Sequence, residues 1–203
     1  MPSAATLDAR CRWCGEDPVY TAYHDTEWGF PVGDDRRLFE KICLEGFQAG
    51  LSWITILRKR EAFRDAFAGF EIERVARMDA RAVTRLLGNA AIVRHRGKIE
   101  STLNNARRAR ALAEEWSSLA AYFWRWEPAL ATRPQKLTRA VLTTMATSAE
   151  SVALAKDLKR RGWSFVGPTT IYAFMQAMGL VNDHEHDCAT RAKVQAARQA
   201  FKP

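Results

Sequence analysis

Apolar residues recur at intervals of three and four positions along most of the chain, the spacing that gathers them on one face of an α-helix. Such stretches cover residues 34–46, 52–67, 79–88, 97–116 and 119–126. Two more follow, from 147 to 162 and from 168 to 178. The strict alternation of apolar and polar residues that marks a half-buried strand is absent from the sequence. The pattern therefore predicts an all-α protein.

Local signals indicate where these helices begin. Asp34 or Asp35 is expected to cap the stretch that starts there, because a short carboxylate accepts hydrogen bonds from the free amides of a first helical turn. Thr147 and Glu150 have the spacing of a capping box. Pro168 suits a first turn, where no amide proton is required. Residues 128–144 lack clear periodicity and are interpreted as a soft connection.

The length of 203 residues suits one domain, or two helical lobes that share a core. A protein of this size buries roughly 70% of its unfolded surface, so that it does not need a metal for its size alone. We expect residues 1–203 to form a single globular unit. Frayed or disordered ends are expected at about 1–9 and 190–203, because the chain after Cys188 is basic and termini are the segments that fray most readily.

The charge balance points to a polyanionic partner. The chain has 31 Lys and Arg against 23 Asp and Glu, for a net charge of +8, and an isoelectric point near 9.6. Nucleic acid is the first candidate for such a surface, although many basic proteins bind nothing anionic. Seven tryptophans are compatible with stacking on bases, but tryptophan is also a common core residue.

The cysteines are interpreted together with the expected location. The first ten residues have no apolar segment of a signal peptide, and no run of about 18 apolar residues occurs. A reduced, cytoplasmic protein is therefore expected, in which paired Cys and His residues indicate metal binding rather than disulfides. Cys43 lies in an apolar helical stretch and is interpreted as a core residue.

Two Cys and two His residues near the two ends fit one tetrahedral Zn²⁺ site with no open position for catalysis. His184 and Cys188 are four residues apart and would share a helix face. A rival set replaces His24 with Cys14, which forms a CxxC with Cys11, and His186 offers a further imidazole. The favoured ligands are Cys11, His24, His184 and Cys188, which would join the N-terminal arm to a C-terminal helix.

The segment 86–99 predicts a short turn between two helices with basic side chains around it. In a helix–hairpin–helix unit, the amides of such a turn and the start of the next helix face a DNA phosphate. An ordinary corner between helices is the alternative. The candidate DNA-binding residues are Ala91, Arg94, His95, Arg96, Gly97 and Lys98.

A pocket is predicted where a carboxylate adjoins aromatic residues. Glu45 ends an apolar helical stretch just before Trp53, and a carboxylate beside apolar surface is unfavourable unless something there requires it. Trp13, Tyr23 and Trp28 cluster near the N-terminus, next to the proposed ligand at position 24. The alternative is that the tryptophans belong to the core and that Glu45 is a surface or capping charge.

Five motifs together resemble the 3-methyladenine DNA glycosylase I family, over about residues 11 to 188. They are DPVYTAYHDTEWG at 17–29, ICLEGFQAGLSWI at 42–54, RHRGKI at 94–99, KRRGWSFVG at 159–167 and MQAMGLVNDH at 175–184. The resemblance implies an all-α, helix–hairpin–helix glycosylase fold that carries one structural zinc, with Cys11, His24, His184 and Cys188 as ligands. Ala91 departs from the glycine that the family usually has in the hairpin.

The resemblance also implies an activity, which is the hydrolysis of the N-glycosidic bond of 3-methyladenine in alkylated DNA. Glu45 would recognise the base, Tyr23 and Trp53 would form its aromatic walls, and Trp13 and Trp28 would lie close by. No lysine in the motifs is indicated as a nucleophile, so that a monofunctional enzyme without a lyase step is expected. Double-stranded DNA as partner, free 3-methyladenine as product and a monomeric state complete the expectation.

Overall fold

The computed structural model describes residues 9–203, and within that range the chain is helical without a β-strand. The helices, in chain order, are α1 Pro18–Thr26, α2 Asp35–Gln48, α3 Trp53–Arg58, α4 Arg60–Ala66, α5 Ile72–Ala76, α6 Ala80–Leu87, α7 Arg96–Trp116, α8 Leu119–Trp124, α9 Arg139–Thr144, α10 Ala149–Arg160, α11 Pro168–Ala177 and α12 Ala189–Ala200. Short 3-10 turns add η1 Arg12–Cys14, η2 Ala68–Phe70 and η3 Leu130–Thr132. The all-α prediction is confirmed.

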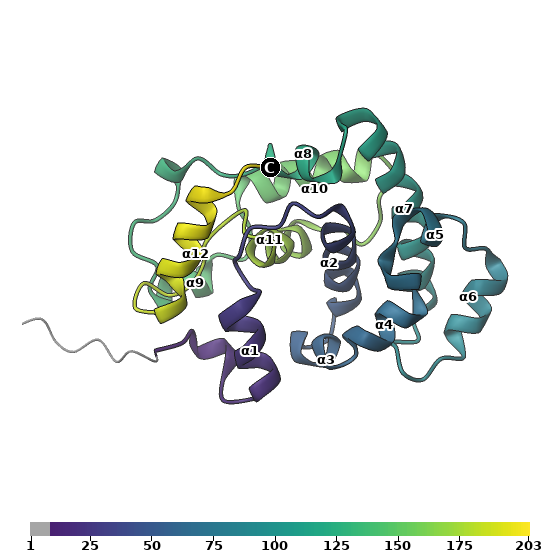
Figure 1. Ribbon diagram of the computed structural model, residues 1–203, viewed down its shortest axis with the longest axis horizontal. Helices are drawn as coiled ribbons and strands as arrows, with labels where there is room; N and C mark the ends of the chain where they lie inside the picture. The colour runs from purple at the N-terminus through teal and green to yellow at the C-terminus, as the bar shows by residue number, and fades with distance from the viewer. Residues whose placement is uncertain (1–8) are drawn as a thin grey trace, which may run out of the picture.

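Helix α11 lies near the centre of the view, with α2 beside it (Figure 1). Helices α4 to α7 form one end of the molecule, and α1, α9 and α12 lie toward the other. Side chains of α11 such as Ile171 and Phe174 are fully buried in a hydrophobic core that also takes in α2, α7, α8 and α10. The N-terminal arm meets the start of α12, where the amide of Ala189 donates a hydrogen bond of 2.8 Å to the carbonyl oxygen of Ala9.

Side chains cap the starts of α2 and α10, although the capping residues of α10 differ from those predicted. Asp34 caps α2 by accepting the amide of Arg37, whereas Asp35 accepts the first two amides of α8 and ties the two helices together. The capping box of α10 uses Ser148 and Ser151 rather than the predicted pair Thr147 and Glu150. The hydroxyl of Ser148 reaches the third amide of that helix, which fixes its start one residue later than expected.

The stretch 52–67 was expected to be one helix but forms two, α3 and α4. Lys59 lies between them with φ −97° and ψ 2°, outside the helical region, and the chain bends there. Residues 128–144, expected to be a soft connection, contain η3 and α9. Leu137 in this segment is buried, and its carbonyl accepts the amide of His186, so that the segment packs against the C-terminal part of the chain.

The expectation that the chain frays after residue 190 is wrong, because Ala189–Ala200 forms α12. Val194 on this helix is fully buried, and the ring of Phe201 packs 4.6 Å from that of Trp124, measured between centroids. The basic side chains of the segment concealed this narrow apolar stripe. Residues 1–8 of the other predicted frayed end lie outside the described residues. None of the described helices combines the length and apolarity needed to cross a bilayer.

One glycine brings the N-terminal arm onto the core. Gly179 follows α11 with φ +81°, and a Cβ there would lie 2.6 Å from backbone atoms of Phe30 and Pro31. The amides of Gly29 and Val32 donate to carbonyl oxygens at the end of α11. Only glycine combines this left-handed conformation with so close an approach of two backbones. The arm that carries α1 is thereby held against α11.

Candidate base pocket and metal centre

A cavity of about 440 Å³ opens between the N-terminal arm, the end of α2, α9 and α11. Its volume falls in the range of small-molecule sites. The five residues predicted for the base pocket, Trp13, Tyr23, Trp28, Glu45 and Trp53, all line it. They come from η1, α1, α2 and α3 and from the turn after α1, so that the fold brings together residues distant in the sequence.

Aromatic rings form much of the wall. Trp13 meets Trp28 edge-on with ring centroids 4.9 Å apart and meets Tyr20 in the same way at the same distance. Tyr23 and Trp53 lie 5.6 Å apart, also measured between centroids. Trp13 remains 37% exposed, which places it toward solvent, whereas Tyr23 is buried. Tyr20 was not among the predicted base-binding residues, although it belongs to the same N-terminal aromatic group and lies one helical turn before Tyr23 on α1.

Glu45 lies near the C-terminal end of α2 and is 5% exposed. Its Oε1 lies 2.9 Å from the ammonium of Lys41, one helical turn earlier. The interpretation of Glu45 as a surface charge is therefore wrong. Its carboxylate lines the cavity and is paired with a buried cation.

Lys41 is the functional-site neighbour that sequence reasoning missed. Its Nζ donates a hydrogen bond of 2.7 Å to the hydroxyl of Tyr23 and lies 3.2 Å from the ring centroid of Trp53. Burial lowers the pKa of Lys41, and the charge of Glu45 opposes that effect. Burial, reinforced by the charge of Glu45, raises the pKa of Tyr23. The available signal was the i, i+4 spacing of Lys41 and Glu45 within the mainly apolar second half of α2.

A second buried carboxylate also borders the cavity. Asp183 is 2% exposed, pairs with Arg133 and accepts hydrogen bonds from the hydroxyl of Tyr172 at 2.7 Å and the amide of Gln176 at 2.9 Å. Its charge is compensated by these donors, so that it fixes the chain just before His184 to α11.

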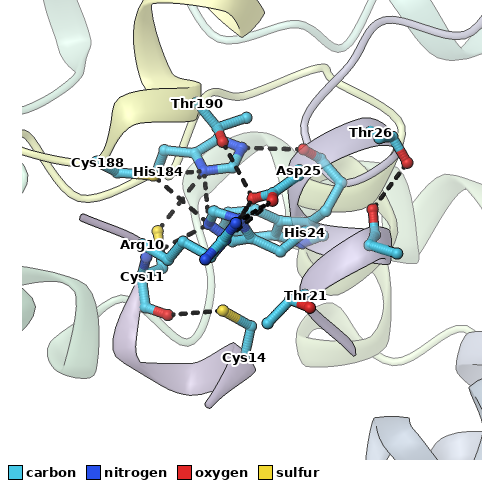
Figure 2. Close-up of polar contacts among 12 residues, drawn as sticks. Arg10, Cys11, Cys14, Thr21, His24, Asp25, Thr26, His184, Cys188 and Thr190 are labelled. Atoms are coloured by element: carbon cyan, nitrogen blue, oxygen red, sulfur yellow. Dashed lines mark hydrogen bonds and ion pairs between the residues drawn. The ribbon is translucent and has the colours of Figure 1, made fainter. Parts of the chain in front are cut away.

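The four predicted metal ligands meet in one buried cluster (Figure 2). The ligand atoms of Cys11, His24, His184 and Cys188 all lie within 4.8 Å of one another. Sulfur-to-nitrogen distances of 3.4, 3.5 and 3.6 Å separate three of the pairs. A tetrahedral zinc, bound 2.3 Å from sulfur and 2.0–2.1 Å from nitrogen, would hold such atoms about 3.5 Å apart. The donor set and its geometry fit a tetrahedral metal ion.

The outer ring nitrogens of both histidines have acceptors. His24 Nδ1 lies 2.8 Å from a carboxylate oxygen of Asp25, and His184 Nε2 lies 3.0 Å from the carbonyl oxygen of Trp28. Such partners fix the tautomer that turns the other nitrogen toward a metal. A hydrogen bond from the Cys11 thiol lowers the pKa of the Cys188 thiol, which favours the thiolate that a metal requires.

The rival ligands lie outside this cluster. Cys14 turns its sulfur to the carbonyl oxygen of Cys11, 3.1 Å away (Figure 2). The side chain of His186 is 39% exposed and is not part of the group. Because Tyr23 directly precedes His24, the cluster and the cavity share α1.

The predicted DNA-binding turn is the connection between α6 and α7, residues 88–95. The ring of His95 caps α7 by accepting the amide of Lys98, and Gly97 lies in the first turn of that helix. Ala91 is exposed, and its carbonyl oxygen accepts a hydrogen bond of 3.0 Å from Lys59. Arg94 and Arg96 are exposed.

Lys98 was predicted to contact DNA, but the structure shows its ammonium buried and bound within the protein. It is 7% exposed, and its ammonium donates to the carbonyl oxygens of Phe47 at 2.9 Å and Ala49 at 2.5 Å. These carbonyls end α2, where the helix dipole favours a cation. Lys98 therefore fixes the end of the helix that carries Glu45.

Comparisons with known proteins identify the family to which the chain belongs. A family model described as methyladenine glycosylase matches residues 13–192. The DNA-3-methyladenine glycosylase of Haemophilus influenzae is 44% identical over 186 residues, which are 90% of this chain and 97% of that protein. DNA-3-methyladenine glycosylase 1 of Escherichia coli is 47% identical over 180 residues, 88% of this chain and 95% of that protein.

Solved structures resemble the fold at similar coverage. A crystal structure of 3-methyladenine DNA glycosylase I superposes with a TM-score of 0.81 at 50% identity, covering 89% of this chain and 98% of that one. The Staphylococcus aureus enzyme, in a structure on 3-methyladenine recognition, gives 0.82 at 37% identity over 90% and 96%. The chain belongs to the methyladenine glycosylase family, as the sequence motifs indicated.

Proposed function

We propose that this protein hydrolyses the N-glycosidic bond of 3-methyladenine in alkylated double-stranded DNA, as a monomer, and releases the free base. The observation that carries the proposal is the cavity of about 440 Å³ with Glu45 and aromatic rings in its wall, in a chain of this family. Such a cavity suits an extruded purine, and base extrusion is how enzymes reach a base inside a duplex.

The chemistry of the substrate fits these residues. A purine methylated at N3 is positively charged, so that it is already a good leaving group and needs no strong general acid. Trp53 and Tyr23 offer π faces that attract a cation by about 0.5–2 kcal/mol. Glu45 supplies a charge-assisted hydrogen bond acceptor for the edge of the base. Activation of the attacking water by the same carboxylate is compatible with this arrangement.

The absence of a lyase step is also part of the proposal. A Schiff-base mechanism requires a lysine amine that reaches the sugar. Lys41 is close, but its ammonium is engaged by Glu45 and Tyr23, and it does not line the main cavity. We therefore expect an abasic site as the only DNA product. Borohydride, which traps Schiff bases covalently, should not link this protein to alkylated DNA.

A structural zinc completes the proposal. Cys11, His24, His184 and Cys188 would hold it, and four protein ligands leave no position for water or substrate. When bound, it supplies no chemistry to the reaction and acts as a cross-link between the arm that carries Tyr23 and the segment before α12. The α6–α7 connection is proposed to act as a helix–hairpin–helix contact to a phosphate, through its backbone amides and the exposed Arg94 and Arg96.

The test is release of 3-methyladenine from methylated duplex DNA, measured by chromatography against the spontaneous rate. Glu45→Gln should lower the rate at least about tenfold, because it removes the charge that meets the cationic base. Glu40→Gln is the matched control, since Glu40 is a buried carboxylate of the same helix that pairs with Arg64 and does not line the main cavity. Release no faster than the spontaneous rate would instead identify a binder of damaged DNA.

A further inference from the structure

The ammonium of Lys41 touches the three residues to which base recognition is assigned. It lies 2.9 Å from Glu45, donates to the hydroxyl of Tyr23 and sits 3.2 Å from the ring centroid of Trp53. A buried cation therefore stands in contact with the anion and with the π faces that would attract a positively charged base.

Lys41 is separated from the main cavity by these walls. It lines a cavity of only about 30 Å³, which shares Tyr23 and Trp53 with the main one. The side chain of Lys41 is 7% exposed, so that little solvent screens its charge. The electrostatic field of the Lys41 ammonium consequently extends through the rings of Tyr23 and Trp53 to a base in the main cavity.

Glu45 is the ion-pair partner of Lys41 in the described part of the chain. The two carboxylates that line the small cavity, Glu27 and Glu40, pair with Arg60 and Arg64 at 2.6 and 2.8 Å. The charge of Arg60 lowers the pKa of Lys41, whereas the charge of Glu27 raises it. The charge of Glu45 is therefore shared between a resident cation and any cation that enters the main cavity.

We propose that Lys41 is a specificity-determining residue of the base pocket, which limits the preference for a positively charged purine over an uncharged one. The inference rests on the proposed function and names a residue that tunes it. Lys41 offsets the charge of Glu45 and draws electron density from the rings of Trp53 and Tyr23, so that the pocket selects more by shape and less by charge. Replacing it with a neutral side chain increases the charge preference.

The test uses two free bases at pH 7.5, the cation 3,9-dimethyladeninium and the neutral 9-methyladenine, with binding measured by tryptophan fluorescence. The quantity compared is the ratio of the two dissociation constants, since the ratio cancels general damage to the pocket. Lys41→Met, which has a similar length, should shift the ratio about tenfold toward the cation, equal to about 1.4 kcal/mol. Lys41→Arg keeps the charge and should leave the ratio within about twofold of that of the unaltered protein.

Lys41→Gln is the second variant, because it keeps a donor for Glu45 if the methionine variant fails to fold. It should shift the ratio in the same direction. A ratio that stays constant in the neutral variants would overturn the proposal, and so would a shift toward the neutral base, which would make Lys41 a positioning residue for Glu45. The ratio is measured without DNA and without base excision, so that a failure of this test is distinct from an absence of 3-methyladenine release.

Discussion

Replacing Cys188 with serine should prevent zinc binding at the cluster of Cys11, His24, His184 and Cys188, and Cys14→Ser provides the matched control. Both thiols are buried in the same part of the molecule, but only the Cys188 sulfur lies within 3.4–3.5 Å of the two imidazoles. We expect the unaltered protein and the Cys14 variant to hold one zinc per chain and the Cys188 variant to hold much less. The experiment thereby separates the cluster seen in the structure from the rival CxxC set.

The size of the effect follows from mass action. A ligand that binds only the folded state at a thousand times its dissociation constant stabilises by about 4.1 kcal/mol. For a chain of about 200 residues, each kcal/mol shifts the melting temperature by roughly 2–4 °C, so that a loss of roughly 8–16 °C is expected for Cys188→Ser. A picolinate chelator should lower the melting temperature of the Cys14 variant and leave that of the Cys188 variant nearly unchanged.

The assays are zinc content by atomic emission and thermal unfolding by circular dichroism. A Cys188 variant that retains one zinc, or a Cys14 variant that loses it, would refute the assignment of the ligands. Zinc-free purified protein that cannot be loaded, with a melting temperature indifferent to chelators, would refute the metal site altogether.

Three further predictions concern the interface and the fold. Arg96→Ala should weaken binding to duplex DNA almost equally for all sequences and reduce the salt slope by about one, whereas the exposed Arg36 at the start of α2 should tolerate the same change; equal salt slopes would place the interface elsewhere. Gly179→Ala should lower the free energy of unfolding in urea by about 3 kcal/mol or more, because the added Cβ would lie 2.6 Å from backbone atoms. Gly50→Ala, with a similar φ but open space around it, should lower it by only about 1 kcal/mol. Equal losses in the two variants would disprove the close-contact argument. The effect of burial on the Asp157 carboxyl is outweighed by hydrogen bonds from arginine and tyrosine, which hold its pKa at about 2, compared with about 3.9 in the unfolded chain. The carboxylate therefore contributes about 1–2 kcal/mol to stability above pH 4, and this contribution is lost as the pH falls to 2. The difference in stability between the unaltered protein and Asp157→Asn should close over this interval, and a constant difference would contradict the prediction.

The helical class and most helix positions could be predicted from the apolar pattern, because burial on one face imposes a period of 3.6 residues. The C-terminal helix was missed for a physical reason. Its burial depends on Val194 and on Phe201 reaching Trp124, and a stripe so narrow is hidden among basic residues. Nothing in the local sequence marks Lys59 as the residue that divides 52–67 into α3 and α4.

The candidate site shows the same limit. The residue types of the metal cluster and of the pocket wall could be named from motifs, since their chemistry is explicit in Cys, His, Glu and Trp. The contacts of the two buried lysines could not be predicted. Lys98 was expected at DNA but its ammonium binds carbonyls about 50 positions earlier, and Lys41 passed unnoticed although it contacts Glu45. The partner that fixes each charge lies outside the local sequence.

The sequence positions of the four Cys and His residues also determine when their cluster can assemble during synthesis of the chain. His24 and His184 are 160 positions apart, so that a ribosome adding about 5–20 residues per second emits the second pair of ligands roughly 10–30 s after the first. During that interval the nascent chain carries only two of the four residues of the cluster. The arm that bears Tyr23 consequently gains its final anchor only after almost every other helix has emerged.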